Sequence, residues 1–291
     1  MRQFVLVIAS VLVLSACERE TPRPSSVDWK SLEFKCVHEK DIWPKITDTE
    51  ADQWFKTARA YDKSGKESVE DEMFLLYEKA AERNHFKAMA NLASLYIERG
   101  RPEDVPKAIE LVERLMAMNI SSGYYQMATF LEQGIGVEQD RNAALAYYRK
   151  SADLGNRQGQ YVVGKKLLSI HKDALEPERV RAIAIQMLEC ALAQGEAKAG
   201  DRLGWHFAEG TGDASRGLAY FQRAAALGNM DSLYVLYTAF KDGDWGTSID
   251  TARAACYYKL LEEVRADNKK TFPNIDRICP LPPKPLPPAR P

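Results

Sequence analysis

Five residues that can end a helix recur at nearly equal intervals along the middle of this chain. They are Asn84, Asn119, Gly155, Gly195 and Gly228, which lie 35, 36, 40 and 33 residues apart. Asn and Gly tolerate the left-handed backbone conformation that closes a helix, so the interval has a backbone cause. A period of this length is typical of proteins built from repeated supersecondary units. The interval therefore predicts a stack of similar units between about residues 73 and 265.

Each of these residues follows an amphipathic helical pattern and precedes a second one. In the second pattern, a small residue is followed four positions later by an apolar residue and then by another small residue, as in Gly159, Val163 and Gly164. Residues at this spacing lie on one helical face, and the Gly or Ala lets a neighbouring helix approach closely. A two-helix unit cannot bury its apolar stripe alone, whereas stacked units can. The pattern therefore predicts an all-α protein.

The unit at residues 121–155 resembles the Sel-one-like repeat, a relative of the tetratricopeptide repeat. The other units are degenerate copies of it. The resemblance implies a right-handed α-solenoid of stacked two-helix repeats over residues 73–265, preceded by an N-terminal segment with one helix at 32–72. The matching positions are Gly123, Met127-Ala128, Leu131, Gly134-Ile135-Gly136-Val137, Asp140, Ala144, Tyr147-Tyr148, Ser151-Ala152 and Gly155.

The first 16 residues predict an export signal. Arg2 precedes an apolar run from Phe4 to Leu14, which rises only about 16 Å as a helix and is too short to span a membrane. The residues that follow, Leu14 to Cys17, are similar to the lipobox of bacterial lipoproteins. That resemblance implies cleavage before Cys17, acylation of Cys17 and, from Glu18, an outer-membrane anchor with the body in the periplasm. The alternative is an ordinary secretory signal with a chance cysteine.

Two proline-rich stretches flank the predicted repeats. Residues 17–31 are polar and rich in Pro and Ser, as expected of a flexible tether. Residues 266–291 end in PLPPKPLPPARP and predict an extended tail.

Four cysteines remain once Cys17 is assigned to lipid. An oxidising compartment permits two disulfides among Cys36, Cys190, Cys256 and Cys279, with three possible connectivities. The pair Cys256 and Cys279 is slightly favoured, because helix 251–265 ends shortly before the segment that carries Cys279. Cys190 is equally well interpreted as a small buried helix residue.

The chain shows little sign of catalytic, metal or nucleic-acid chemistry. Its four histidines fall in different units without metal-ligand spacing, and no phosphate-binding loop or nucleophile elbow is present. Lys and Arg number 40 against 41 Asp and Glu, so no global charge favours nucleic acid. We expect no enzyme activity and no cofactor. The cysteine spacing also departs from that of cysteine-rich Sel-one-like proteins, which counts against a cell-wall enzyme of that type.

A stacked helical array presents a concave surface, and aromatic residues recur at equivalent positions on it. By analogy with tetratricopeptide repeats, residues two before and two after the central apolar position of each first helix point into the groove. Tyr and Trp are frequent anchors of protein interfaces. The alternative is that they fill gaps between repeats. The candidate partner-binding residues are Tyr125, Tyr161, Lys165, Asp201, Trp205 and Tyr234.

These features together predict a non-enzymatic periplasmic lipoprotein that binds another protein. Residues 32–66 followed by degenerate repeats are similar to lipoproteins associated with type VI secretion phospholipase effectors. That resemblance implies an immunity protein whose partner is a secreted phospholipase. The alternative function is an envelope scaffold for cell-wall or secretion machinery.

Replacing Cys17 by Ser should abolish lipid attachment, because serine offers no thiol to acylate. We expect the Cys17→Ser variant as an unprocessed or soluble form, whereas the wild-type mature N-terminus carries acyl groups. Mass spectrometry of the mature N-terminus measures this directly. A wild-type N-terminus without acyl groups would instead indicate the ordinary secretory signal.

Overall fold

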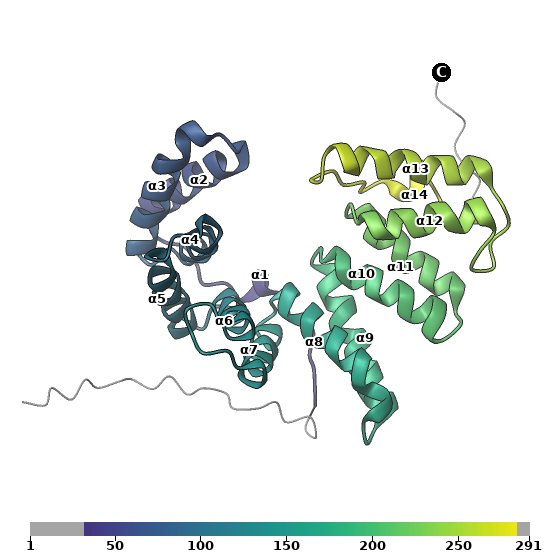
Figure 1. Ribbon diagram of the computed structural model, residues 1–291, viewed down its shortest axis with the longest axis horizontal. Coiled ribbons are helices and arrows are strands. Elements are labelled where there is room, and N and C mark those ends of the chain that lie inside the picture. The colour runs from purple at the N-terminus through teal and green to yellow at the C-terminus, as the bar shows by residue number, and fades with distance from the viewer. Residues whose placement is uncertain (1–31, 284–291) are drawn as a thin grey trace, which may run out of the picture.

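Paired helices follow one another along an open arc in the computed structural model, which describes residues 32–283 (Figure 1). No strand occurs among these residues. The predicted signal peptide, Cys17, the tether at 17–31 and the last part of the tail, 284–291, lie outside the described residues. The arc is an all-α solenoid, as the repeat pattern predicted.

Six antiparallel helix pairs make up the arc within the described residues. Each pair packs against the pair before it and the pair after it along the chain. The pairs are α2 (Thr49–Ser64) with α3 (Glu70–Glu82), α4 (Phe86–Arg99) with α5 (Asp104–Ala117), α6 (Ser121–Gln133) with α7 (Arg141–Asp153), α8 (Arg157–Ile170) with α9 (Pro177–Ala193), α10 (Ala197–Trp205) with α11 (Ala214–Ala226), and α12 (Met230–Asp242) with α13 (Thr251–Ala266). Short elements complete the chain: α1 (Glu39–Ile42), η1 (Glu67–Val69), η2 (His171–Asp173), the π-helical turn η3 (His206–Gly210) and α14 (Ile275–Ile278).

The five predicted stop residues all adopt the left-handed conformation. Their φ angles are 58° at Asn84, 56° at Asn119, 82° at Gly155, 90° at Gly195 and 83° at Gly228. An L residue other than Asn or Asp is strained in this region, which explains the choice of residue. The stops therefore separate one helix pair from the next, as the sequence predicted.

Small residues in the first helix of each pair let the second helix of the pair approach closely. A Cβ on Gly164 would lie 3.0 Å from Leu188 Cγ of α9, and one on Gly204 would lie 2.5 Å from the ring of Phe221 on α11. Leu188 and Phe221 are fully buried. The glycines are therefore required by packing, since a larger residue would push the paired helices apart.

An extended segment, residues 32–48, crosses several repeats, and we call it the strap. Cys36 of the strap forms a disulfide with Cys190 of α9, 154 residues later. Further along, the carboxylate of Glu39 accepts hydrogen bonds from Ser121 Oγ at 2.7 Å and from Asn156 Nδ2 at 3.0 Å. Trp43 then packs near Phe86 of α4, with ring centroids 5.8 Å apart. The strap thus links α9, α8, α6 and α4.

At the turn around Gly155 the backbone of the strap contacts the solenoid directly. The backbone nitrogen of Glu39 donates to the carbonyl oxygen of Gly155 at 3.2 Å and to Gln194 Oε1 at the same distance. Gln160 Nε2 donates to the carbonyl of Val37 at 2.9 Å. The strap therefore satisfies polar groups at two consecutive repeat boundaries, which buried polar groups require.

The C-terminal segment differs from the extended tail expected for residues 266–291. Cys279 forms a disulfide with Cys256 of α13 and is fully buried. Phe272 N donates to the carbonyl of Ala226 at 2.7 Å, and Tyr257 Oη donates to the carbonyl of Cys279 at 2.8 Å. Apolar side chains at Phe272 and Ile275 cover the end of the last helix pair, so this part folds back as a cap before the proline run begins.

No helix within residues 32–283 combines the length and the apolar character needed to cross a bilayer.

Replacing Gly155 by Ala should destabilise the protein more than replacing Gly100 by Ala. Both residues have left-handed φ, +82° and +70°, but a Cβ at Gly155 would lie 2.6 Å from Glu39 N, whereas one at Gly100 meets nothing within 4 Å. We expect a loss of about 1 kcal/mol for Gly100→Ala from backbone strain alone and about 3 kcal/mol for Gly155→Ala. Denaturant unfolding compares the two. Equal losses would mean that the strap moves aside without cost.

Candidate functional site

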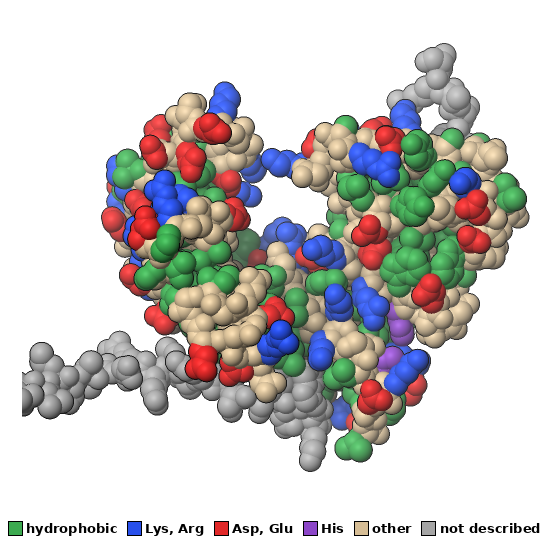
Figure 2. Space-filling model, viewed as in Figure 1, with side chains coloured by type: hydrophobic (Ala, Val, Ile, Leu, Met, Phe, Trp, Pro, Cys, Tyr) green, Lys and Arg blue, Asp and Glu red, His purple; other side chains and the backbone are tan. Residues whose placement is uncertain are grey.

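The predicted groove residues lie on the first helices of successive pairs, which face the inside of the arc. In Figure 1, α4, α6, α8 and α10 border the open centre, while α3, α5, α7 and α9 lie farther out. The space-filling view shows a hollow between the two arms (Figure 2). The candidate residues stand on α6 (Tyr125), α8 (Tyr161, Lys165), α10 (Asp201, Trp205) and α12 (Tyr234).

A side-chain amide links the first helices of the α4–α5 and α6–α7 pairs. Gln126 of α6 donates from Nε2 to the carbonyl of Ala90 at 2.8 Å and to Ser94 Oγ at 2.9 Å, both on α4. Ala90 and Ser94 are the groove positions of the first repeat. Gln126, the residue next in sequence to Tyr125, therefore faces the preceding first helix.

Tyr125 and Tyr161 are both partly buried on the inner face. The ring of Tyr125 lies 5.5 Å from that of Tyr148 on α7, centroid to centroid. Burial raises the pKa of both tyrosines, and the nearby carboxylate of Glu196 raises it further. Since one carboxylate acts on both rings, Tyr125 and Tyr161 face a common region in front of α10.

Asp201 forms a hydrogen bond between two repeats. Its Oδ1 accepts a hydrogen bond from Ser232 Oγ of α12 at 2.8 Å. Burial raises the pKa of Asp201 above its ordinary value. This carboxylate therefore joins α10 to α12, and only part of its surface is left for a partner.

Trp205 and Tyr234 occupy contrasting environments. Trp205 packs edge-on against Phe221 at 5.3 Å and against Trp245 at 5.8 Å, centroid to centroid. Tyr234 is 53% exposed, and its nearest ring is Tyr237 at 6.1 Å. Trp205 thus contributes to packing, which was the alternative considered for these aromatics, while Tyr234 offers a surface to a partner.

Lys165 is exposed on α8, with its Nζ 5.9 Å from the centroid of the Tyr161 ring. A lysine over an aromatic ring keeps its charge in solvent while its stem covers apolar surface. The inner face of α8 therefore combines an aromatic side chain with a positive charge.

The π-helical turn η3 directly follows Trp205. His206, its first residue, lies 6.3 Å from His171, measured between ring centroids. Burial, together with the charges of His171 and nearby arginines, lowers the pKa of His206 to about 4. His206 is consequently neutral at physiological pH, in a place where the inner helix is locally widened.

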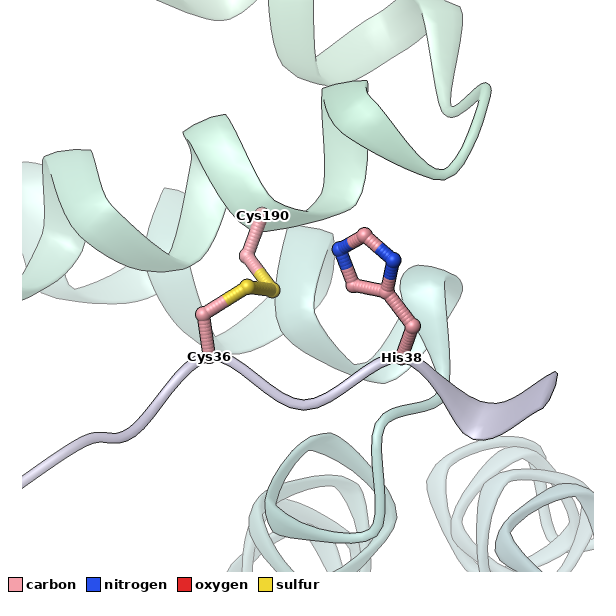
Figure 3. Close-up of side chains that lie close together, drawn as sticks. All are labelled: Cys36, His38 and Cys190. Carbon is pink, nitrogen blue, oxygen red and sulfur yellow. A yellow bond between two sulfur atoms is a disulfide. The ribbon is translucent and has the colours of Figure 1, made fainter. Parts of the chain in front are cut away.

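One group with the residue types of a metal site occurs among residues 32–283. It comprises Cys36, His38 and Cys190, whose ligand atoms lie within 4.8 Å of one another (Figure 3). Both sulfurs are joined to each other in the disulfide, so they do not provide the thiolates that a metal would need. In this form, the group serves to fasten the strap.

The strap is the main functional element that sequence reasoning missed. The even number of cysteines pointed to two disulfides, but nothing local indicated that Cys36 pairs with Cys190. The hydrogen bonds of Glu39 and Val37 depend on residues more than 80 positions away. The second disulfide joins Cys256 and Cys279, the pair slightly favoured from the sequence.

Comparison with known families identifies Sel1 repeats in the chain. The Sel1 repeat family matches residues 74–85, 86–115, 121–156 and 201–229. These matches fall on α3 to α7 and on α10 to α11, the regular part of the arc.

Solved structures extend the likeness to most of the chain. The immunity protein PA5088 of Pseudomonas aeruginosa has a TM-score of 0.70 and 27% identity, covering 86% of this chain and 94% of that one. The immunity protein Pa5087 of the same organism gives 0.65 and 27%, covering 87% and 96%.

A curated relative gives a shorter match. Protein sel-1 homolog 2 of Homo sapiens is 27% identical over 166 residues, 52% of this chain. The chain spans about a quarter of the length of this relative, since the match covers 24% of it.

Trp205→Ala and Tyr234→Ala should separate packing from surface roles. We expect Trp205→Ala to reduce the free energy of unfolding by about 3 kcal/mol, because it leaves a cavity beside Phe221. Tyr234→Ala should change it by less than about 0.5 kcal/mol, because the side chain is largely exposed. Denaturant titrations followed by circular dichroism measure both. A loss for Tyr234→Ala as large as that for Trp205→Ala would assign Tyr234 to packing instead.

Proposed function

We propose that this Sel1-repeat protein is a periplasmic, lipid-anchored immunity protein that neutralises a type VI secretion phospholipase effector by binding it along the inner face of the arc. The observation that carries this proposal is the likeness to PA5088 at 27% identity over 94% of that protein's length. A match of this extent includes more than the repeats, since it covers 86% of this chain.

The geometry of the inner face supports protein binding. Tyr234 is exposed, Tyr161 is partly buried, and Lys165 adds a charge beside Tyr161 on α8. Large aromatic side chains bury much area while few rotamers are lost, which favours their use at interfaces. The helices that carry them are fixed by stacking and, for α8, by the strap as well, so the surface is organised before a partner arrives.

The predicted anchor at Cys17 supports the proposed place of action. A phospholipase delivered to the periplasm attacks membrane lipids. An inhibitor tethered to the membrane by residues 17–31 has a high effective concentration near that substrate. The effector would then meet the inhibitor before it damages the bilayer.

Co-expression tests the proposal in a sensitive bacterial strain. A candidate type VI secretion phospholipase is directed to the periplasm, and growth is measured with and without this chain. We expect the wild-type chain to restore growth and Tyr161→Ala/Tyr234→Ala to restore it poorly, because the latter removes two inner-face aromatics. Leu75→Ala is the control: it removes an exposed apolar side chain from α3 and should protect like wild type.

Two outcomes would contradict the proposal. Failure of the wild-type chain to protect, when both proteins reach the periplasm, would exclude immunity against that effector and favour a scaffold role. Full protection by Tyr161→Ala/Tyr234→Ala would place the interface away from the inner face. Thermal melts of each variant establish that any loss of protection is not a loss of folding.

A further inference from the structure

Positive charge is concentrated at the middle of the inner face, on α8 and α10. The whole chain has a net charge of −1, yet α8 carries Arg157, Lys165 and Lys166 and no acidic residue. The neighbouring inner helix, α10, carries Lys198 and Arg202 with one carboxylate, Asp201. Lys and Arg side chains are seen along the hollow where α8 and α10 lie (Figure 2).

Within the described part of the chain, the carboxylates nearby form no ion pair with Lys165, Lys198 or Arg202. Asp201 accepts its hydrogen bond from Ser232, on the side facing α12, and its pKa is raised by burial. Glu196, at the start of α10, lies close enough to raise the pKa of Tyr161. Among the ion pairs formed within residues 32–283, none includes Lys165, Lys198 or Arg202.

Arg157 has a structural role, in contrast with the other basic residues of α8 and α10. Its Nη1 donates to the carbonyl of Gln194 at 3.0 Å, which satisfies a group at the end of α9. Lys165 and Lys198 are exposed and have no comparable partner. The group of interest is therefore Lys165, Lys198 and Arg202, which we call the cationic triad.

The placement of Arg202 contrasts with the contact between α4 and α6. Arg202 occupies the position in α10 that Gln126 occupies in α6, and Lys165 occupies the position in α8 that Ser94 occupies in α4. Gln126 and Ser94 form a hydrogen bond at 2.9 Å. The corresponding pair on α8 and α10 consists of two cations, which repel each other.

The Nε atom of Arg202 adds a second sign of an incomplete contact. This nitrogen is buried and, among the described residues, has no hydrogen-bond partner. A buried donor without a partner costs folding free energy. Natural proteins depart from favourable packing and hydrogen bonding most often at functional sites. The repulsion between Lys165 and Arg202 and the unpartnered Arg202 Nε therefore both point to an acceptor that another molecule supplies.

We propose that the cationic triad receives an acidic segment of a partner protein, whose carboxylates lie between α8 and α10 while its apolar or aromatic side chains contact Tyr161. This inference rests on the proposed function, because it describes the part of the effector that the inner face binds. Two lysines and one arginine can form charge-assisted hydrogen bonds with at least two carboxylates. The charge also steers an acidic partner toward the hollow and increases the rate of association.

Fluorescence anisotropy with defined peptides tests the triad directly. The probe is a labelled synthetic peptide in which Glu alternates with Tyr and Leu, and its counterpart has Lys in place of Glu. We expect the wild-type protein to bind the Glu peptide and not the Lys peptide, with affinity falling as salt is added. Lys165→Glu/Lys198→Glu should weaken binding of the Glu peptide by about tenfold or more and gain affinity for the Lys peptide.

A matched control makes the same change in net charge elsewhere. Lys79→Glu/Lys259→Glu alters two exposed lysines on α3 and α13, and it should bind the Glu peptide like wild type. Equal weakening by the two double variants would overturn the proposal, because the effect would then be one of total charge. Unchanged binding in Lys165→Glu/Lys198→Glu would also overturn it. Circular dichroism confirms that each variant is folded.

Two further measurements distinguish other sources of negative charge and separate this inference from the proposed function. Binding to phosphatidylglycerol-containing vesicles without binding to the Glu peptide would assign the triad to a membrane and overturn the proposal. In the co-expression assay, protection by Lys165→Glu/Lys198→Glu equal to wild type would keep immunity but overturn the triad as its contact. Peptide binding as expected, with no protection by wild type, would support the triad and refute immunity.

Discussion

Burial of one helix pair by the next is the interaction on which the whole structure depends. No pair in the arc can cover its own apolar stripe, so Gly123 of α6 against Leu115 of α5 and Gly159 of α8 against Ser151 of α7 are needed to bring neighbouring pairs within contact. The left-handed turns at residues such as Asn119 and Gly228 set the angle at which the next pair begins. Stability and curvature are therefore produced by the same contacts. The inner face exists because these contacts place the first helices side by side.

The inner face is a surface where packing and recognition compete for the same positions. Asp201 and Trp205 occupy groove positions but are largely used between repeats, through Ser232 and Trp245. Tyr234 and Lys165 occupy equivalent positions and remain exposed. Some groove residues of a repeat thus pack against the adjacent repeat, while others remain exposed to a partner. The likeness to Pseudomonas immunity proteins agrees with a surface organised in this way for binding another protein.

The parts of the fold that could be predicted from the sequence are those governed by local rules. The turns at Asn84 and Gly155 follow from backbone preferences, and the helices follow from apolar spacing over one or two turns. The strap could not be predicted, because Glu39 contacts Ser121 and Asn156 through the fold alone. The capping segment at Phe272 was obscured by the proline run that follows it. For the groove, periodicity identified the correct helices, but it did not distinguish Trp205 from Tyr234, since both stand at groove positions and differ only in their neighbours.

The strap also gives the arc an uneven elasticity. A solenoid can bend, because small changes in the angle between neighbouring helix pairs add up along its length. Between α4 and α9, the strap limits such changes, because it is attached to α9 by a disulfide and to α4 by the packing of Trp43. Beyond α9 no part of the strap lies along the arc, so the strap does not restrain the pairs from α10 to α13. We therefore expect bending to be concentrated where α9 meets α10, so that the width of the hollow depends mainly on the position of the pairs from α10 to α13.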